Sequence, residues 1–312
     1  MTTLLSFRDN IKAFCCRYDY IITPVLKFIL SIIILESLHK QLGYLPILGN
    51  IMLILVISGV CAFLPVEMLT IVGGIFIIAQ ATKVSVDVGI LMLALVLIFY
   101  CGYMRFFTKT GIIVLLVPLA YSGHLAYALP IVLGFLVGPK AIIPAIFGVI
   151  LYYAEDGLGE LLNVLAASAD KDEAVAGYQY ILNGLIDNKQ MLLTLVVFTC
   201  VILITYIIYR ASFKYSWIVA FVVGGIMNVV LFLVGSLTKV TDMEISPILL
   251  GSLAGILFAL IIQFGKGVVD YQRTELLQFE DDDYYYYVKA IPKLAVAESN
   301  KNIKHINSKT HN

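Results

Sequence analysis

The chain has 312 residues, of which 61% are hydrophobic and 13% are charged, and its formal net charge is zero. Soluble proteins have about a quarter of charged residues, so this composition excludes an ordinary soluble domain, and the lack of a basic excess gives no reason to expect nucleic-acid binding. Apolar blocks follow one another from Thr23 to Phe264 and are apolar on all sides. We therefore predict an all-α fold, a polytopic integral membrane helix bundle whose main partner is the lipid bilayer.

The first 21 residues carry an apolar stripe. Leu4, Phe7, Ile11 and Phe14 recur at helical spacing. This spacing predicts a short amphipathic helix within residues 1–21, lying on the cytoplasmic leaflet. A disordered polar leader is the alternative that the sequence leaves open.

Seven further blocks approach the length of about 20 apolar residues that a membrane-spanning helix needs. The region 111–153 adds one crossing, so we expect about eight transmembrane helices plus one re-entrant or broken-helix element. Residues 22–153 form an N-terminal transmembrane part, and residues 191–268 form a C-terminal part of three helices. The seven blocks are 22–38, 46–64, 67–82, 86–104, 191–209, 215–235 and 246–265.

Basic residues at the joints between blocks set the orientation. Arg105–Lys109, Arg210–Lys214 and Lys266 each follow an apolar block, and Lys and Arg stay on the cytoplasmic side. With both termini in the cytoplasm, every basic joint falls inside and the acidic segment 154–190 falls outside. We expect a multi-pass protein of the plasma (cytoplasmic) membrane of a bacterium.

The acidic segment 154–190 carries two apolar stripes at helical spacing. Leu158, Leu161 and Leu165 belong to the first stripe, and Leu182 belongs to the second. The pattern predicts two short helices, which either close as a cap over the outer mouth or lie flat on the lipid surface.

Residues 111–153 must change sides of the membrane, so they hold an odd number of crossings. Three crossings would need about 60 residues, more than the segment has, and Pro and Gly recur through it. We predict one kinked crossing at about 111–129, followed by a re-entrant or broken-helix hairpin that turns near Gly138–Pro139. Interrupted helices often mark transport sites, because freed backbone groups are tolerated only beside protein or water. The alternative is that Pro and Gly merely kink ordinary helices.

Polar side chains in or near this interrupted region are candidates for a substrate or ion pathway, because polar groups at membrane depth are costly. A lysine at a re-entrant tip would attract an anion, a carboxylate or an acidic partner such as Glu67; alternatively, it reaches the membrane interface beside a short helix. Tyr152, Tyr153 and Asp156 could line the same polar cavity. The candidates are His124, Lys140, Tyr121, Tyr127, Glu155 and Glu67.

The cytoplasmic tail, residues 269–312, combines a run of acids with a run of tyrosines. β-prone residues beside a charge run predict an extended segment that adds to the sheet edge of a cytoplasmic protein partner. The alternative places the tyrosines at the membrane–water boundary or on the inner face of the bundle. The partner-binding candidates are Glu280, Asp281, Asp282, Asp283, Tyr284, Tyr285, Tyr286 and Tyr287.

The sequence contains no motif that predicts catalysis or a cofactor. Gly265-Lys266-Gly267 lacks the upstream glycine and the following Ser or Thr of a P-loop, so an ATPase would have to be a separate subunit. The five cysteines and four histidines have no metal-ligand spacing. We therefore expect no enzymatic activity, no cofactor and no metal. The sequence leaves open whether the protein forms an oligomer.

A weak internal sequence repeat supports an architecture of two similar halves. Val72–Gly74 precedes Thr82–Ser85 and an apolar run, and Val223–Gly225 precedes Thr238–Thr241 and a second run. Repeated halves are frequent in transporters, although so few matches in apolar sequence also arise by chance.

Two functions fit these patterns. The first is a permease-like protein that moves a small solute, ion or lipid through the bundle at the interrupted-helix site. The second is a non-transporting membrane scaffold or assembly protein that recruits a cytoplasmic partner through its tail.

Overall fold

The computed structural model describes residues 2–167, 176–211, 215–238, 245–266, 275–280 and 284–290. The chain divides into two compact units, the larger comprising Asp19–Ile262 and the smaller comprising Met1–Tyr18 with Gln263–Asn312. Within its described residues the larger unit consists of helices and turns, and strands occur only in the smaller unit.

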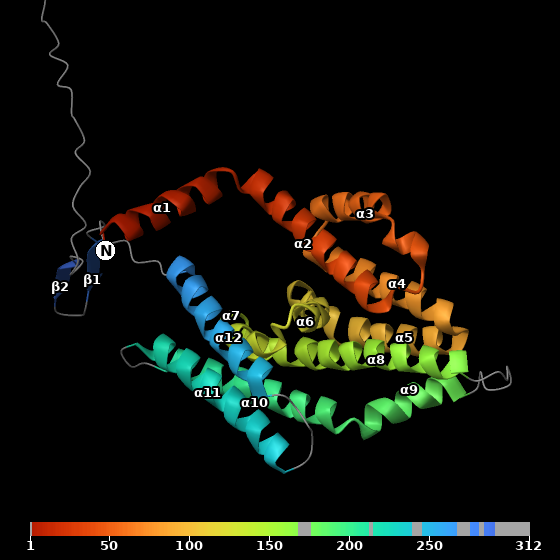
Figure 1. Cartoon of the computed structure of the whole chain (residues 1–312). Coiled ribbons are helices and arrows are strands. Elements are labelled where there is room, and N and C mark those ends of the chain that lie inside the picture. The colour runs from red at the N-terminus through yellow and green to blue at the C-terminus, as the bar shows by residue number, and fades with distance from the viewer. Residues whose placement is uncertain are drawn as a thin grey trace, which may run out of the picture. The chain divides into compact units, whose positions relative to one another are not determined.

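The larger unit is a bundle in which some neighbours along the chain pack together, as α10 and α11 do, and some helices farther apart in the chain do so too, as α6 and α8 do (Figure 1). The last turn of α12 extends beyond this unit. Its helices are α2 (Asp19–Leu42), α3 (Ile51–Phe63), α4 (Val66–Val84), α5 (Val86–Phe99), α6 (Ile113–Ser122), α7 (Leu129–Leu136), α8 (Ile142–Ala167), α9 (Ala176–Asp187), α10 (Lys189–Arg210), α11 (Ser216–Leu237) and α12 (Ile245–Lys266).

Seven helices in the described residues are long and apolar enough to cross a membrane. The predicted fold class, an all-α polytopic membrane bundle, is therefore confirmed. A π-helical turn, Tyr100–Met104, lengthens α5 to a full span. The seven are α2, α4, α5 with this turn, Gly138–Gly159 at the start of α8, α10, α11 and α12.

One of the expected crossings is short. α3 has 13 residues, about 20 Å at 1.5 Å per residue, whereas the hydrocarbon core is about 30 Å thick. Pro46 opens a separate 3₁₀ turn ahead of the helix, and the Asn50 side chain caps α3 by accepting the Met52 amide at 3.0 Å. These residues delay the start of the helix, so the block 46–64 does not form one continuous span.

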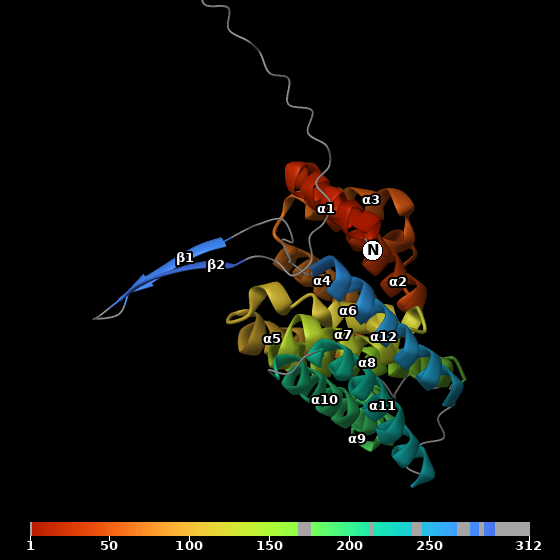
Figure 2. The ribbon, with the colours of Figure 1, turned by 90° about the vertical axis from the view of Figure 1, so that its left-hand side faces the viewer.

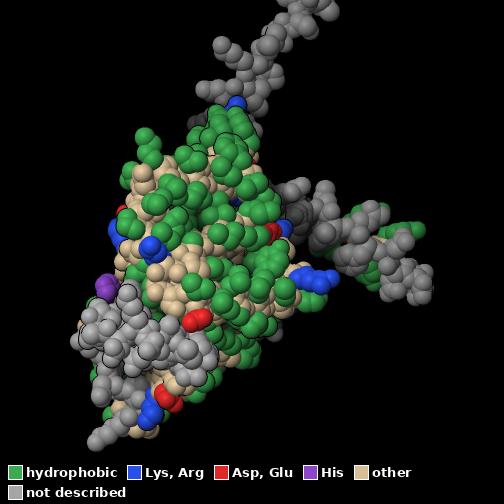
Figure 3. Space-filling view, turned by 90° about the vertical axis from the view of Figure 1, so that its right-hand side faces the viewer, with side chains coloured by type: hydrophobic (Ala, Val, Ile, Leu, Met, Phe, Trp, Pro, Cys, Tyr) green, Lys and Arg blue, Asp and Glu red, His purple; other side chains and the backbone are tan. Residues whose placement is uncertain are grey.

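Large apolar side chains remain exposed along the bundle, as expected for a surface that faces lipid. Phe63 is 85% exposed, and Leu250 and Ile261 on α12 are each 66% exposed. Figure 3 shows one face on which hydrophobic side chains predominate and charged ones are scattered singly. Such continuous apolar exposure would be unstable in water, and it supports a multi-pass membrane protein.

The buried side chains form two apolar cores that share α6 and α8. Val114 and Leu115 of α6 belong to the core built on α2, α4 and α5, whereas Ile113 and Val117 belong to the core built on α7, α10, α11 and α12. α6 therefore lies between the two cores and presents a different face to each.

The predicted boundary between residues 153 and 154 falls inside α8, which continues to Ala167. Leu158 and Leu161 stay buried beyond that boundary, and Ile181 of α9 belongs to the same core. Both apolar stripes of the acidic segment are thus helical, but the first is the end of α8 and not a separate short helix, whereas the second is the separate helix α9. Residues 168–175 lie outside the described part of the chain.

The smaller unit contains a helix and a β-hairpin. Helix α1 (Thr2–Arg17) confirms that the N-terminal stripe is helical, and Phe7 and Phe14 on it are 64% and 59% exposed. Strand β1 (Glu275–Glu280) pairs antiparallel with β2 (Tyr285–Ala290), so that Phe279 faces Tyr286 across the pair (Figure 2). An extended conformation is therefore confirmed for the two described stretches of the tail, which pair with each other; the pairing with a partner protein stays a prediction, and Asp281, Asp282 and Asp283 lie outside the described residues.

Candidate functional site: a cavity at the α6–α7 hairpin

Helices α6 and α7 form a hairpin that starts and ends at the same end of the bundle. The buried Tyr103 hydroxyl donates to the carbonyl of Lys140, after α7, at 2.5 Å, and it shares a 2.7 Å hydrogen bond with Thr110, before α6. One side chain thus holds both ends of the hairpin together. We call this place the base of the hairpin.

The two arms are too short to cross a bilayer. α6 has 10 residues and α7 has 8, about 15 Å and about 12 Å in length. Ring stacking of Tyr121 on Tyr152, with centroids 3.9 Å apart, and the closeness of Val117 to Gly148 show that α6 and α8 run in the same direction. The segment 111–153 therefore contains a hairpin of two short helices followed by a helix long enough to cross a membrane.

This arrangement corrects the predicted order of the two elements. We expected a kinked crossing at 111–129 and then a hairpin turning near Gly138–Pro139. The hairpin comes first, its tip lies at Gly123–Leu125, and the span begins at Gly138. The 3₁₀ turn Gly138–Ala141 connects α7 to α8 at the base, where Gly138 adopts a φ of 72° that suits glycine.

The tip ends α6 with a left-handed residue. His124 has a φ of 56°, its amide donates to the Tyr121 carbonyl at 3.1 Å, and the Leu125 amide donates to the Ala120 carbonyl at 2.7 Å. These two bonds make a Schellman motif, in which glycine is the usual left-handed residue. A histidine in this place is uncommon, and its side chain is exposed.

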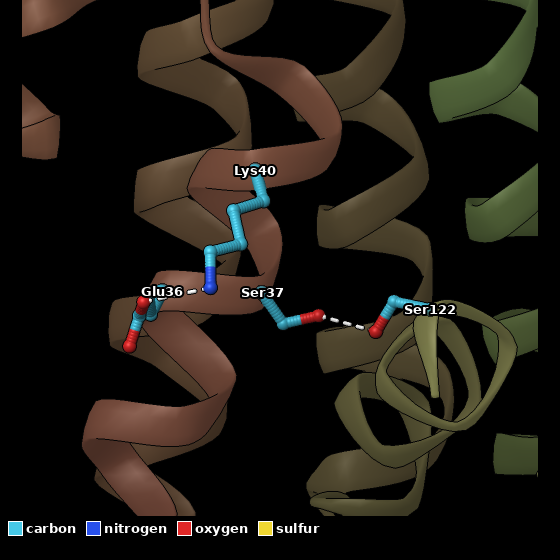
Figure 4. Close-up of polar contacts among 4 residues, drawn as sticks. All are labelled: Glu36, Ser37, Lys40 and Ser122. Atoms are coloured by element: carbon cyan, nitrogen blue, oxygen red, sulfur yellow. Dashed lines mark hydrogen bonds and ion pairs between the residues drawn. The ribbon is translucent and has the colours of Figure 1, made fainter. Parts of the chain in front are cut away.

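Hydrogen bonds attach the two sides of the tip to different helices. Ser37 of α2 bonds to Ser122 at 2.7 Å, as Figure 4 shows beside the Glu36–Lys40 ion pair. Past the tip, the buried Asn228 of α11 donates to the Tyr127 carbonyl at 2.9 Å. The tip is thus held by α2 on one side and by α11 on the other.

A cavity of about 230 Å³ lies beside the end of α6. Ser122 and Asp156 in its lining are exposed, so the cavity reaches the surface of the bundle. Its volume is sufficient for several water molecules. The lining residues come from α2, α6 and α8; they are Gln41, Tyr121, Ser122, Tyr152, Glu155 and Asp156. We call it the Glu155 cavity.

Glu155 is the least satisfied polar side chain of this cavity. It is 4% exposed, and neither carboxyl oxygen has a hydrogen-bond partner among the described residues. The Oε1 atom of Gln41 and the hydroxyl of Tyr121 are likewise buried without a standard hydrogen bond in this part of the chain, although Thr194 lies within interaction range of that hydroxyl. Buried polar groups are nearly always paired, so such a group of unpaired oxygens indicates a place for water, an ion or another ligand.

The carboxyl groups of the cavity act electrostatically on Tyr44, in the loop after α2. Burial raises the pKa of the Tyr44 phenol above its ordinary value, and the nearby carboxyls of Glu155 and Asp156 raise it further. When they are ionised, Glu155 and Asp156 therefore give the surroundings of the cavity a negative electrostatic potential.

Tyr121 and Glu155 are the two predicted pathway residues that line the cavity, together with Tyr152 and Asp156. Lys140 does not join them. It lies at the base with its Nζ 5.5 Å from the centre of the Phe107 ring, and Glu155 follows about 22 Å farther along α8. Of the two predictions for Lys140, a place at the tip is wrong, because the exposed Lys140 follows the hairpin instead of forming its turn; a place beside a short helix agrees with its position directly after α7.

Three other predicted residues lie outside the lining of the cavity. His124 is exposed at the tip. Tyr127 packs its ring edge-on against Phe232, with centroids 5.0 Å apart. Glu67 is half-buried in the first turn of α4, where its charge suits the positive end of the helix dipole.

Gln41 and Ser122 were not identified from the sequence. Gln41 lies beyond the predicted end of the first span at residue 38. Its only signal is its spacing of four residues from Ser37, which places two polar side chains on one helix face. Ser122 gives no signal beyond its position next to Gly123.

Among residues 2–167, 176–211, 215–238 and the later described stretches, no group of three or more His, Cys, Asp or Glu side chains could hold a metal ion. Comparison of the chain with known protein families, with curated proteins and with solved structures finds no match.

Proposed function

We propose that this protein is a permease that moves a small polar solute or ion across the membrane, with the Glu155 cavity as its binding site. Glu155 carries the proposal: a carboxyl group lies about 22 Å along a membrane-spanning helix from its Lys140 end, buried and unpaired within the described residues. Glu155 is four residues from the end of the span Gly138–Gly159. A buried and unpaired carboxylate within a membrane span is costly, and such residues usually mark substrate or ion pathways.

The hairpin beside Glu155 supports the same proposal. A chain that enters and leaves the bilayer on one side must place backbone groups without helical partners at membrane depth, which is tolerated only beside protein or water. Here the tip reaches the exposed rim of the Glu155 cavity at Ser122. Many transporters bind their substrates at such interrupted helices.

Alternating access to the cavity tests the proposal. We would replace the native cysteines, introduce Ser122→Cys, and label membrane vesicles of each orientation with a membrane-impermeant maleimide. A permease exposes its binding site to each side in turn, so we expect Ser122→Cys to react from both faces. Reaction from one face only, or from neither, would contradict the proposal.

Two control positions calibrate the labelling. Ser58 is fully buried in the apolar bundle, so Ser58→Cys should react from neither face. Lys140 is exposed at the base, so Lys140→Cys should react from one face, the cytoplasmic one in an orientation that places the basic joint Arg105–Lys109 inside.

A scaffold or assembly protein is the second candidate function. The observation in its favour is the exposure of the tail tyrosines: Tyr284, Tyr285 and Tyr287 are 67%, 69% and 74% exposed. Aromatic side chains on or next to a strand are suited to bind a cytoplasmic protein partner. A separate ATPase subunit stays a proposal for the energy source of the permease.

A further inference from the structure

We propose that Glu155 exchanges a proton for a monovalent cation within the Glu155 cavity. The inference deepens the proposed function and rests on it for the transport step, but the binding step can be tested without transport. It follows from the chemistry, charge and size of the cavity.

The cavity offers oxygen atoms from three helices. Both carboxyl oxygens of Glu155, the Oε1 atom of Gln41 and the Tyr121 hydroxyl are buried without standard hydrogen bonds among the described residues. Three of these four atoms are pure acceptors when Glu155 is ionised. A set dominated by acceptors is satisfied by a donor or a cation, because of these four atoms only the Tyr121 hydroxyl can donate a hydrogen bond to an anion.

The described lining of the cavity contains no Lys, Arg or His, so no positively charged side chain there balances the charge of Glu155. Lys40, next to Gln41 in sequence, is bonded to Glu36 at 2.8 Å. The titratable groups that the described residues place around Glu155 are phenols and carboxyls; they are Tyr44 from the loop after α2, Tyr121 from α6, Tyr152, Tyr153 and Asp156 from α8, and Asp187 beyond Asp156 at the end of α9. The charge of an ionised Glu155 therefore has to be balanced by a proton or by a cation from solution.

A single charge is the best match for this site. Glu155 is the one buried carboxyl of the described lining, whereas Asp156 is exposed and can be hydrated. A divalent ion would leave one charge unbalanced in a medium of low dielectric constant. The volume of about 230 Å³ accommodates a monovalent ion with some of its water.

Binding of the two ligands is mutually exclusive. In the protonated state the carboxyl is neutral, and its O–H can donate to an acceptor such as Gln41 Oε1. When a cation enters, the O–H bond breaks, the proton leaves to water, and the carboxylate oxygens contact the cation. One proton is released for each cation bound, so the net charge of the site is unchanged.

The experiment measures this exchange on the full-length protein in nanodiscs. Sodium chloride, potassium chloride or tetraethylammonium chloride is added in a weakly buffered solution, and proton release is followed with a pH indicator. Infrared difference spectra record the C=O band of the protonated carboxyl in the same samples. We expect about one proton per chain in at least one of the three salts, with loss of the protonated carboxyl band.

Three variants make the assignment specific. Glu155→Gln should release no proton and lack the band, whereas Glu36→Gln, the same change at an exposed carboxyl on α2, should behave as the wild type. Tyr121→Phe removes one hydroxyl and should keep the band while shifting the salt dependence about tenfold to higher concentration. If Glu155→Gln does not fold, Tyr121→Phe still tests the cavity.

Two results would overturn the inference. One is a band that no salt changes, and the other is equal proton release from wild type and Glu155→Gln. Failure of the proposed function has a different signature: Ser122→Cys would react from a single face while cation-dependent proton release persists.

Discussion

At Gly148 the lack of a side chain lets α6 and α8 approach closely. A β-carbon there would lie 2.7 Å from Val117 Cβ and 2.9 Å from the Val114 carbonyl oxygen. Gly157, farther along the same helix, has no neighbouring atom within 4 Å of such a position among the described residues. The two glycines therefore offer a matched pair in one helix.

We expect Gly148→Ala to lower the free energy of unfolding by about 1–3 kcal/mol, because the added methyl group forces the helices apart. Gly157→Ala should raise it by about 0.5–1 kcal/mol, since alanine loses less backbone entropy in a helix. Denaturant unfolding in one detergent measures both. Equal effects of the two substitutions would contradict the close packing of α6 on α8.

Substitutions of His124 can distinguish a structural role of this residue from a role in transport. Glycine adopts the left-handed conformation without the cost of about 1 kcal/mol that other residues carry. His124→Gly should therefore increase the thermal stability, and His124→Val should decrease it. If the imidazole belongs to the transport pathway, as its position in the interrupted region suggested, His124→Gly abolishes transport despite the stability gain; unchanged transport assigns the residue to the turn alone.

Among the elements, the hairpin depends most on contacts that are distant in sequence. Tyr103 joins Thr110 to the Lys140 carbonyl at its base. Tyr103→Phe removes both hydrogen bonds, so we expect a loss of about 1–2 kcal/mol in the free energy of unfolding. Tyr100→Phe, at an exposed tyrosine of the same π-helical turn, is the control. Similar unfolding free energies for both variants would mean that the base is held by other contacts.

The same element shows how far the sequence could predict the fold. Chain length and the alternation of sides predicted one crossing and one re-entrant or broken-helix hairpin in 111–153, and the structure has one helix long enough to cross and a hairpin of two short helices there. Their order was not accessible, because Pro, Gly and apolar residues occur along the whole segment. The order follows from pairing between distant residues, such as Tyr103 with Lys140 and Ser37 with Ser122.

The residues of the candidate site also differ in whether the sequence could predict them. Glu155 and Tyr121 could be selected from the sequence, because polar groups in an apolar segment stand out locally. Gln41 lies on α2, more than 100 residues before Glu155 in the chain, so no sequence pattern predicts that the two side chains line one cavity. Lys140 was misplaced because a glycine–proline turn predicts a change of direction but not its depth in the membrane.

For the molecule as a whole, the division into two units separates the two candidate functions. The residues of the Glu155 cavity all belong to Asp19–Ile262, and the tail hairpin belongs to the other unit. Deleting residues 275–312 should leave membrane insertion and cation-dependent proton release unchanged. A protein partner that is lost with the tail, together with unchanged proton release, would show that both functions coexist. Loss of proton release on deletion would contradict the independence of the cavity.

The attachment of the hairpin tip has a mechanical consequence. Ser122 is tied to α2 and Tyr127 to α11, so any sliding of one core past the other stretches the short segment between them. Two neutral hydrogen bonds resist that motion with only about 1–3 kcal/mol, a few times the thermal energy. Such a restraint is strong enough to favour one resting shape of the molecule and weak enough to break and re-form many times each second.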